Sequence, residues 1–232
     1  MRTVDWAAWR PRTSVPEGGE GLREQKKRLL RQRLSDTATE MFLERGFDAV
    51  RVSEIAQACG VSEKTVFNYF STKEALILDQ GESTMVALRD GLADTNHSVV
   101  EAVLGILSGE LGVMTSWIAA QDDPVQAVGM VRRFGALTRS TPSLRAYHRE
   151  MTDRLVAVAA EALARRDRTS PDEPEPQIAA TALVGLWSVQ FRSLGKHLDG
   201  ARTAAQIHAA VTADVRRAAR LIDIGLASFA SA

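Results

Sequence analysis

Apolar residues recur at steps of three and four through most of the chain, which is the spacing of one face of an α-helix. No alternating apolar and polar pattern of useful length is present, so we expect no β-strand. The pattern predicts an all-α fold with about nine helices. The expected helices are 22–45, 52–59, 62–70, 71 to about 92, 98 to about 117, 124–137, 142–165, a helix that carries 180–198, and 203–229.

Capping signals indicate where several of these helices begin. A Ser or Thr followed three residues later by Glu or Gln forms a capping box, in which the two side chains satisfy backbone amides of the first turn. An Asp or Thr followed by proline gives an N-cap with proline at the first helical position. The signals are Ser71–Glu74, Ser98–Glu101 and Thr203–Gln206 of the first kind, and Asp123–Pro124 and Thr141–Pro142 of the second. They predict the starts of five helices.

Two short helices are separated by a single tight turn before Ser62. Gly60 can adopt a left-handed conformation without a Cβ clash, so it can end the first helix and redirect the chain. Ser62 is a favourable N-cap for the second helix. The apolar residues that are spaced to lock the pair together are Ile55, Val61, Val66 and Phe70. This arrangement predicts a helix-turn-helix, whose second helix can lie in the major groove of DNA.

The segment resembles the DNA-binding domain of the TetR family of transcriptional regulators, over roughly residues 23–80. The matching residues are Gly46, Phe47, Val52, Ile55, Ala56, Ala58, Gly60, Val61, Ser62, Thr65, Phe67, Tyr69, Phe70, Lys73, Glu74 and Leu76. Two positions depart from the family: Arg51 replaces a capping Thr or Ser, and Cys59 replaces Ala. The resemblance implies a larger helical domain after the helix-turn-helix, with a small-molecule effector site and a homodimer interface.

Charge supports nucleic-acid binding locally and not globally. The 29 Lys and Arg residues balance 29 Asp and Glu residues, but residues 22–34 hold six basic residues and only one acid, Glu24. Directly before a helix-turn-helix, such a run favours phosphate contact. The N-terminus shows no secretory signal, and no apolar run approaches the span of a bilayer, so we expect a cytoplasmic protein with no membrane partner. The single cysteine, Cys59, excludes an internal disulfide.

The expected recognition helix turns Val66 and Phe70 inward, so Lys64, Phe67 and Asn68 fall on its outward face. Lysine can donate to guanine, asparagine can pair with adenine, and an aromatic ring can contact a thymine methyl group. The resemblance implies that Thr65 and Tyr69 of this helix hold phosphates of an operator duplex. The predicted DNA-binding residues are Arg51, Ser53, Ser62, Lys64, Thr65, Phe67, Asn68, Tyr69 and Lys73.

The last two helices carry regular apolar seams. The seam residues are Ala180, Val184, Trp187, Phe191, Leu194 and Leu198 in the first, and Ile207, Val211, Val215, Ala218 and Ile222 in the second. Part of each seam must be intramolecular core. The rest favours a homodimer of four helices, two from each subunit, because helix-turn-helix proteins use dimers to space two recognition helices.

Residues 85–191 are rich in large apolar side chains, which line adaptable small-molecule pockets and plain cores alike. The resemblance favours a pocket for an apolar or amphipathic effector. The predicted ligand-binding residues are Leu107, Trp117, Met130, Phe134, Tyr147, His148, Met151, Trp187 and Phe191. Further polar candidates are Arg133, Gln190 and Arg192.

The four histidines are scattered, and the chain has no phosphate-binding loop, nucleophile elbow or cysteine–histidine framework, so we expect neither an enzyme nor a cofactor or metal site. The sequence predicts a flexible arm at 1–21, a helix-turn-helix domain at 22–72, and a regulatory and dimerisation domain at 73–232. The leading hypothesis is a repressor that an effector releases from DNA. The alternative is a DNA-binding regulator that is constitutive or is controlled by a protein partner.

Overall fold

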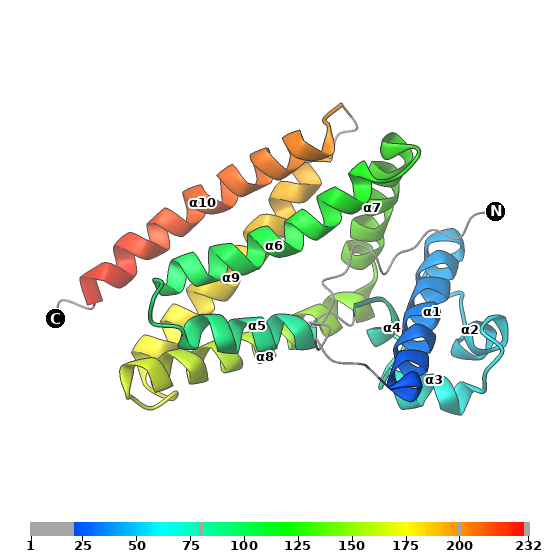
Figure 1. Ribbon diagram of the computed structural model, residues 1–232, viewed down its shortest axis with the longest axis horizontal. Helices are drawn as coiled ribbons and strands as arrows, with labels where there is room; N and C mark the ends of the chain where they lie inside the picture. The colour runs from blue at the N-terminus through cyan, green and yellow to red at the C-terminus, as the bar shows by residue number, and fades with distance from the viewer. Residues whose placement is uncertain (1–20, 79–80, 199–200, 230–232) are drawn as a thin grey trace. The chain divides into compact units, whose positions relative to one another are not determined.

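A computed structural model describes residues 21–78, 81–198 and 201–229, and these residues form ten α-helices and no strand (Figure 1). The all-α prediction is confirmed, with one helix more than expected. Apart from Gly21, the expected N-terminal arm lies outside the described residues. The helices are α1 (Leu22–Arg45), α2 (Val52–Ala58), α3 (Glu63–Tyr69), α4 (Ala75–Leu78), α5 (Gly81–Ala93), α6 (Val99–Ala119), α7 (Pro124–Ser140), α8 (Pro142–Asp167), α9 (Pro174–His197) and α10 (Ala204–Phe229).

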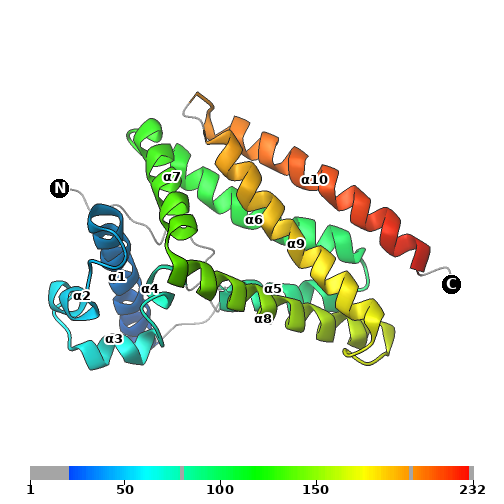
Figure 2. The same ribbon diagram turned by 180° about the vertical axis from the view of Figure 1, so that it is seen from behind.

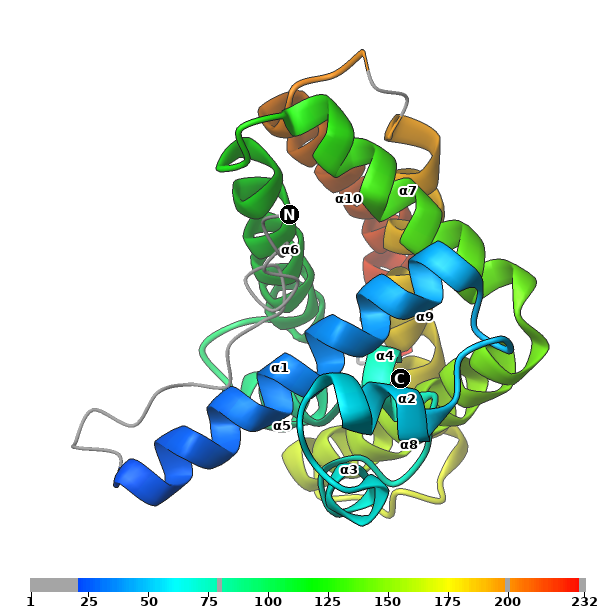
Figure 3. The ribbon, with the colours of Figure 1, turned by 90° about the vertical axis from the view of Figure 1, so that its right-hand side faces the viewer.

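The chain divides into two compact units, and the first unites residues up to Gln80 with residues 133–148. Helices α1 to α4 form its main part, and Figure 3 shows α2 and α3 together beside α1. The core residues of this unit include Leu34, Phe42, Ile55, Val66, Phe70 and Leu76. Phe134 of α7 and Leu144 of α8 belong to the same core. The core behind the helix-turn-helix is therefore completed by Phe134 and Leu144, which lie far beyond α3 in the sequence.

Two glycines with positive φ end helices in the first unit. Gly46 has φ 86° at the end of α1, and Gly60 has φ 67° in the turn between α2 and α3. Both angles lie where a Cβ atom is strained, which is why glycine is favoured at these positions. The expected role of Gly60 is confirmed.

The structure has two helices where the sequence predicted a single helix from Ser71 to about Leu92. Helix α4 ends at Leu78 and α5 begins at Gly81, and residues 79–80 between them lie outside the described residues. The expected Ser71–Glu74 capping box is wrong. The hydroxyl of Thr72 accepts the bond from the backbone nitrogen of Ala75, at 3.2 Å, because α4 starts at Ala75.

The second unit comprises residues 81–132 and the chain from Arg149 onward. Helix α6 lies at its centre and contacts α5, α9 and α10, and Figure 2 shows α9 alongside both α6 and α10. Three of the expected helix starts are confirmed by their hydrogen bonds. Capping boxes form at Ser98–Glu101 and Thr203–Gln206, and Asp123 Oδ1 accepts from the nitrogen of Gln126 at 2.9 Å.

Helix α6 is 21 residues long with a mean hydropathy of 1.5 over its most apolar window, so it is long and apolar enough to span a bilayer. The expectation that no apolar run approaches this length is wrong. One such helix is weak evidence for a membrane protein, because the core helix of a helical bundle has the same composition. In this chain Val103, Leu107, Leu111 and Ile118 of α6 are buried in the second unit.

Two polar clusters join helices inside the second unit. The carboxylate of Glu110 on α6 accepts hydrogen bonds from Thr84 of α5 and from the indole nitrogen of Trp187 of α9. Asp214 of α10 accepts bonds from Ser193 at 2.8 Å and lies 3.0 Å from His197 Nε2, both on α9. These contacts fix α5, α6, α9 and α10 in register with one another.

Candidate DNA-binding surface and regulatory pocket

The recognition helix α3 presents the face expected from the sequence. Val66 and Phe70 are buried, whereas Lys64, Phe67 and Asn68 are exposed, and 46% of the surface of Phe67 is accessible. The expected orientation of this helix is confirmed, and its DNA contacts stay a prediction.

Ser62 caps α3 as the sequence indicates. Its hydroxyl accepts a hydrogen bond from the backbone nitrogen of Thr65 at 3.1 Å, and the two hydroxyl oxygens lie 2.8 Å apart. Both side chains sit at the N-terminus of α3, where backbone amides attract anions such as phosphate. This end of the helix is suited to contact the DNA backbone.

Arg51 precedes α2 without acting as a side-chain cap. Instead Glu54 Oε2 accepts from the backbone nitrogen of Arg51 at 2.7 Å, and Glu54 also forms a 2.8 Å ion pair with Arg45. These bonds lower the pKa of Glu54. The start of α2 is thus stabilised without the family's Thr or Ser, and the Arg51 side chain remains exposed beside Ser53, as phosphate contact requires.

The end of α3 is fastened to α1 by Arg31. Its guanidinium donates to the carbonyl oxygen of Tyr69 and lies 4.5 Å from the centre of the Phe70 ring. Arg31 is therefore a structural member of the basic run, a role that its sequence context did not reveal. The exposed basic residues of this run are Arg23, Lys26, Lys27, Arg28 and Arg33.

Lys73 lies partly inside the first unit. Its ammonium donates to the carbonyl oxygen of Phe47 at 2.7 Å and stands 4.4 Å from the Phe47 ring centre and 5.5 Å from that of Phe42. Burial lowers the pKa of Lys73. The residue therefore ties the start of α4 to the loop after α1, and its predicted phosphate contact stays a prediction.

The nine predicted ligand-binding residues do not gather in one unit. Phe134, Tyr147 and His148 belong to the first unit, where the two aromatic residues pack against the helix-turn-helix core. Burial lowers the pKa of His148. The six that belong to the second unit are Leu107, Trp117, Met130, Met151, Trp187 and Phe191.

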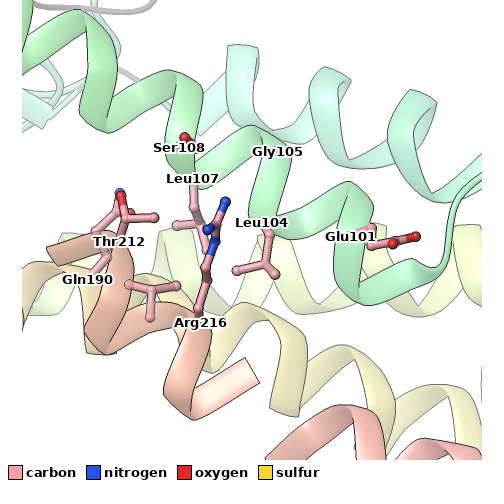
Figure 4. Close-up of a pocket in the computed structure, with 9 residues that line it drawn as sticks. Glu101, Leu104, Gly105, Leu107, Ser108, Gln190, Thr212 and Arg216 are labelled. Carbon is pink, nitrogen blue, oxygen red and sulfur yellow. The ribbon is translucent and has the colours of Figure 1, made fainter. Parts of the chain in front are cut away.

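A pocket of about 450 Å³ lies within the second unit, between α6, α9 and α10 (Figure 4). Of the nine predicted residues only Leu107 lines it, together with Gln190 from the further polar candidates. The other lining residues are Glu101, Leu104, Gly105, Ser108, Thr212, Val215 and Arg216. The small residues of α6 were the available signal, because Gly105 and Ser108 leave space beside one face of that helix.

Much of each expected dimer seam is core of a single chain. Val184 of α9 and Val211 of α10 are buried in the described residues, as are their seam neighbours Ala180, Leu198, Ile207 and Val215. The exposed large apolar side chains on these helices are Ile178 at 58%, Leu221 at 75% and Ile224 at 71%. Leu221 and Ile224 lie on one side of α10, since they are three residues apart.

Comparison with known proteins agrees with both parts of the chain. The family model described as bacterial regulatory proteins of the tetR family matches residues 34–79, and the model described as the MftR C-terminal domain matches residues 113–218. MftR of Mycobacterium tuberculosis, named as a transcriptional regulator of mycofactocin biosynthesis, is 29% identical over 154 residues, which are 66% of this chain and 73% of that protein.

A second relative, the HTH-type transcriptional regulator TcmR of Streptomyces glaucescens, is 28% identical over 167 residues, 70% of this chain and 71% of that protein. A solved TetR-family regulator from Streptomyces coelicolor is 22% identical, with a TM-score of 0.44, over 86% of this chain and 99% of that one. The helix-turn-helix geometry and the two family models lead to one conclusion: the chain belongs to the TetR family of DNA-binding transcriptional regulators.

Proposed function

We propose that this protein is a homodimeric, cytoplasmic repressor that an apolar or amphipathic small molecule releases from its operator. The observation that carries the proposal is the outward face of α3, where Lys64, Phe67 and Asn68 are exposed on a helix locked from behind by buried Val66 and Phe70. In the major groove, Lys64 can donate to guanine, Phe67 can contact the methyl group of thymine, and Asn68 can pair with adenine.

Residues around this face have the chemistry of phosphate contact. Ser62 and Thr65 lie at the N-terminus of α3, Arg51 and Ser53 at that of α2, and Tyr69 near the end of α3. Contacts of this kind position a protein on the duplex, whereas base contacts specify the sequence. We assign reading of bases to Lys64, Phe67 and Asn68 and positioning to the others.

The proposed homodimer is supported by the exposed apolar side chains of α10. Leu221 and Ile224 are mostly accessible in a single chain, and burying such side chains stabilises association by about 25 cal/mol per Å² of apolar surface before entropic costs. A dimer would place two recognition helices one DNA turn, about 34–36 Å, apart.

Effector control would act by linkage between two conformations. A ligand that binds one conformation better shifts the population toward it, and a ligand with equal affinity for both shifts nothing. A coupling of about 1–3 kcal/mol changes DNA affinity about 5- to 150-fold. The pocket in the second unit supports a ligand in that role.

The proposal is tested by selecting an operator from random duplex DNA with the purified protein and measuring binding by fluorescence anisotropy. We expect two half-sites in the selected sequence, and loss of preference at one position per half-site for Asn68→Ala. A selected duplex with no repeated half-site would contradict the dimeric mode. Binding that no small molecule alters would favour constitutive or partner-controlled regulation.

A further inference from the structure

The pocket between α6, α9 and α10 has two chemically distinct parts. Leu104 and Leu107 of α6 and Val215 of α10 supply apolar surface. The polar groups are Ser108 of α6, Gln190 of α9, and Thr212 and Arg216 of α10. Its volume of about 450 Å³ lies within the range of about 300–1,000 Å³ typical of small-molecule sites. A ligand that fills both parts must be amphipathic.

Thr212 brings a buried hydroxyl to the pocket. Two other helical threonines of this unit or its neighbour donate to the carbonyl four residues earlier: Thr115 to Leu111 and Thr138 to Phe134, both at 3.0 Å. Thr212 Oγ1 is buried and makes no such bond in the part of the chain that the structure describes. An unpaired buried hydroxyl is unfavourable, so a ligand atom that hydrogen-bonds with it is favoured.

The charges at the pocket do not cancel each other. The carboxylate of Glu101 is occupied in the capping box of α6, where it accepts from the backbone nitrogen of Ser98 at 3.0 Å. Figure 4 shows this carboxylate pointing away from Arg216, whose side chain extends from α10 toward α6. Among the described residues no acidic group pairs with Arg216. A guanidinium beside neutral donors from three helices is suited to an anionic oxygen group.

We infer that this pocket is the effector site and that its ligand is an amphipathic carboxylate. The carboxylate oxygens are held by Arg216 and by the hydroxyl and amide groups of Thr212, Gln190 and Ser108. The apolar part of the ligand lies on Leu104, Leu107 and Val215. This inference rests on the proposed function, because it takes the second unit to be the one that binds an effector.

The position of the pocket indicates how its ligand would act. Its walls belong to the helix at the centre of the second unit and to the two helices proposed to form the dimer. Occupation would alter the packing of α10 against α6, and with it the positions of Leu221 and Ile224. Effector binding is thereby linked to the dimer contact that spaces the two recognition helices.

Gly105 offers a way to block the pocket without damaging the fold. It lines the pocket on α6, and a Cβ atom built there would meet no heavy atom within 4 Å. Any residue larger than glycine, proline excepted, also has a higher helix propensity than glycine, so the substitution should not weaken α6. Gly109 is the matched control, because it lies one turn further along α6, has the same open surroundings and does not line the pocket.

The test uses calorimetric titration of the full-length protein with hexanoate, octanoate and decanoate, with octan-1-ol and octylamine as neutral and cationic probes. We expect at least one carboxylate to bind wild type and Gly109→Phe, and to lose binding in Gly105→Phe. Arg216→Gln should weaken this binding about tenfold or more, the effect of losing one charge-assisted bond. Thr212→Val should weaken it less, and neither non-anionic probe should match the carboxylate.

The inference is overturned if no carboxylate binds wild type, if Gly105→Phe binds it unchanged, or if octylamine binds equally well. Operator release, measured separately by anisotropy, distinguishes this inference from the proposed function. Carboxylate binding that Gly105→Phe abolishes, without release of DNA, would support the site and contradict the proposed function. Release by another compound, unchanged in Gly105→Phe, would support the proposed function and place the effector elsewhere.

Discussion

Trp187 and Glu110 form a hydrogen bond between helices α9 and α6, in which the indole nitrogen donates to Oε2 at 2.9 Å. Thr84 donates to the other carboxylate oxygen at 2.7 Å. The pKa of Glu110 is nevertheless raised above its ordinary value of 4.5, because burial penalises the charged form more than these two neutral donors stabilise it. The charge of Glu110 is therefore a cost to the folded protein at neutral pH.

Replacement of Glu110 by Gln should stabilise the protein near neutral pH. An amide can accept from Trp187 and donate to the hydroxyl of Thr84, without the cost of burying charge. A raised folded-state pKa means that wild type gains stability as the pH falls through that value toward 4.5, so the advantage of Glu110→Gln should shrink over this range. Chemical denaturation across pH measures it, with exposed Glu82→Gln as the control. An advantage independent of pH would contradict the explanation.

Ser62→Ala should lower the free energy of unfolding by about 1 kcal/mol, because the bond from the backbone nitrogen of Thr65 is lost at the start of α3. Ser71→Ala is the matched control, since Ser71 is exposed and does not cap α4. Urea denaturation of both variants gives the comparison. Equal losses in the two variants would show that the Ser62 cap contributes nothing particular.

Substitutions of Lys73 and Lys64 should have different effects, the first on stability and the second on DNA sequence preference. Lys73→Met removes the bond to Phe47 and the contacts with two rings, so it should cost about 1–2 kcal/mol of stability. Lys64→Met changes an exposed side chain, so it should leave stability within about 0.5 kcal/mol while weakening preference for the selected operator over other DNA. Denaturation and anisotropy are measured on both. A stable Lys73→Met variant would show that its interior contacts contribute little.

Leu221→Glu and Ile224→Glu should yield monomers, because a charge in an apolar contact between subunits is costly. Both side chains are exposed in one chain, so folding of the monomer should be preserved. Sedimentation velocity gives the oligomeric state. Val125→Glu, which changes an exposed apolar residue on α7, is the control and should leave the dimer intact. Dimers in both α10 variants would exclude this face from the interface.

The sequence predicts the parts of the fold that are decided locally. Gly60, Ser62 and the Ser98–Glu101 box each act on backbone groups within a few residues, so their chemistry is visible in the chain itself. The start of α4 shows the limit of this reasoning. Ser71 and Thr72 are adjacent hydroxyl residues, and the backbone conformation decides that Thr72 is the cap.

Long-range packing was not predictable from a single sequence. Phe134 was assigned to a ligand site, but it packs in the helix-turn-helix core, since any buried stripe has the same apolar composition. Lys73 has the charge of a phosphate contact, and only its surroundings show the ammonium over the Phe47 ring. The pocket was missed for a related reason: the small residues Gly105 and Ser108 leave space beside α6, but only the packing of α6 against α10 turns that space into a pocket.

Phe134 and Leu144 also determine how this regulator can be dissected. They lie in the segment 133–148, which joins the first unit although residues 81–132 intervene. A fragment cut after Gln80 would lack both side chains and leave a void where they pack. Such a fragment should be unstable and therefore unsuitable for transferring the DNA specificity to another protein. A chimaera that joins this DNA-binding unit to another regulatory domain must therefore include residues 133–148. The alternative is to transfer only the exposed residues of α3 to another helix-turn-helix.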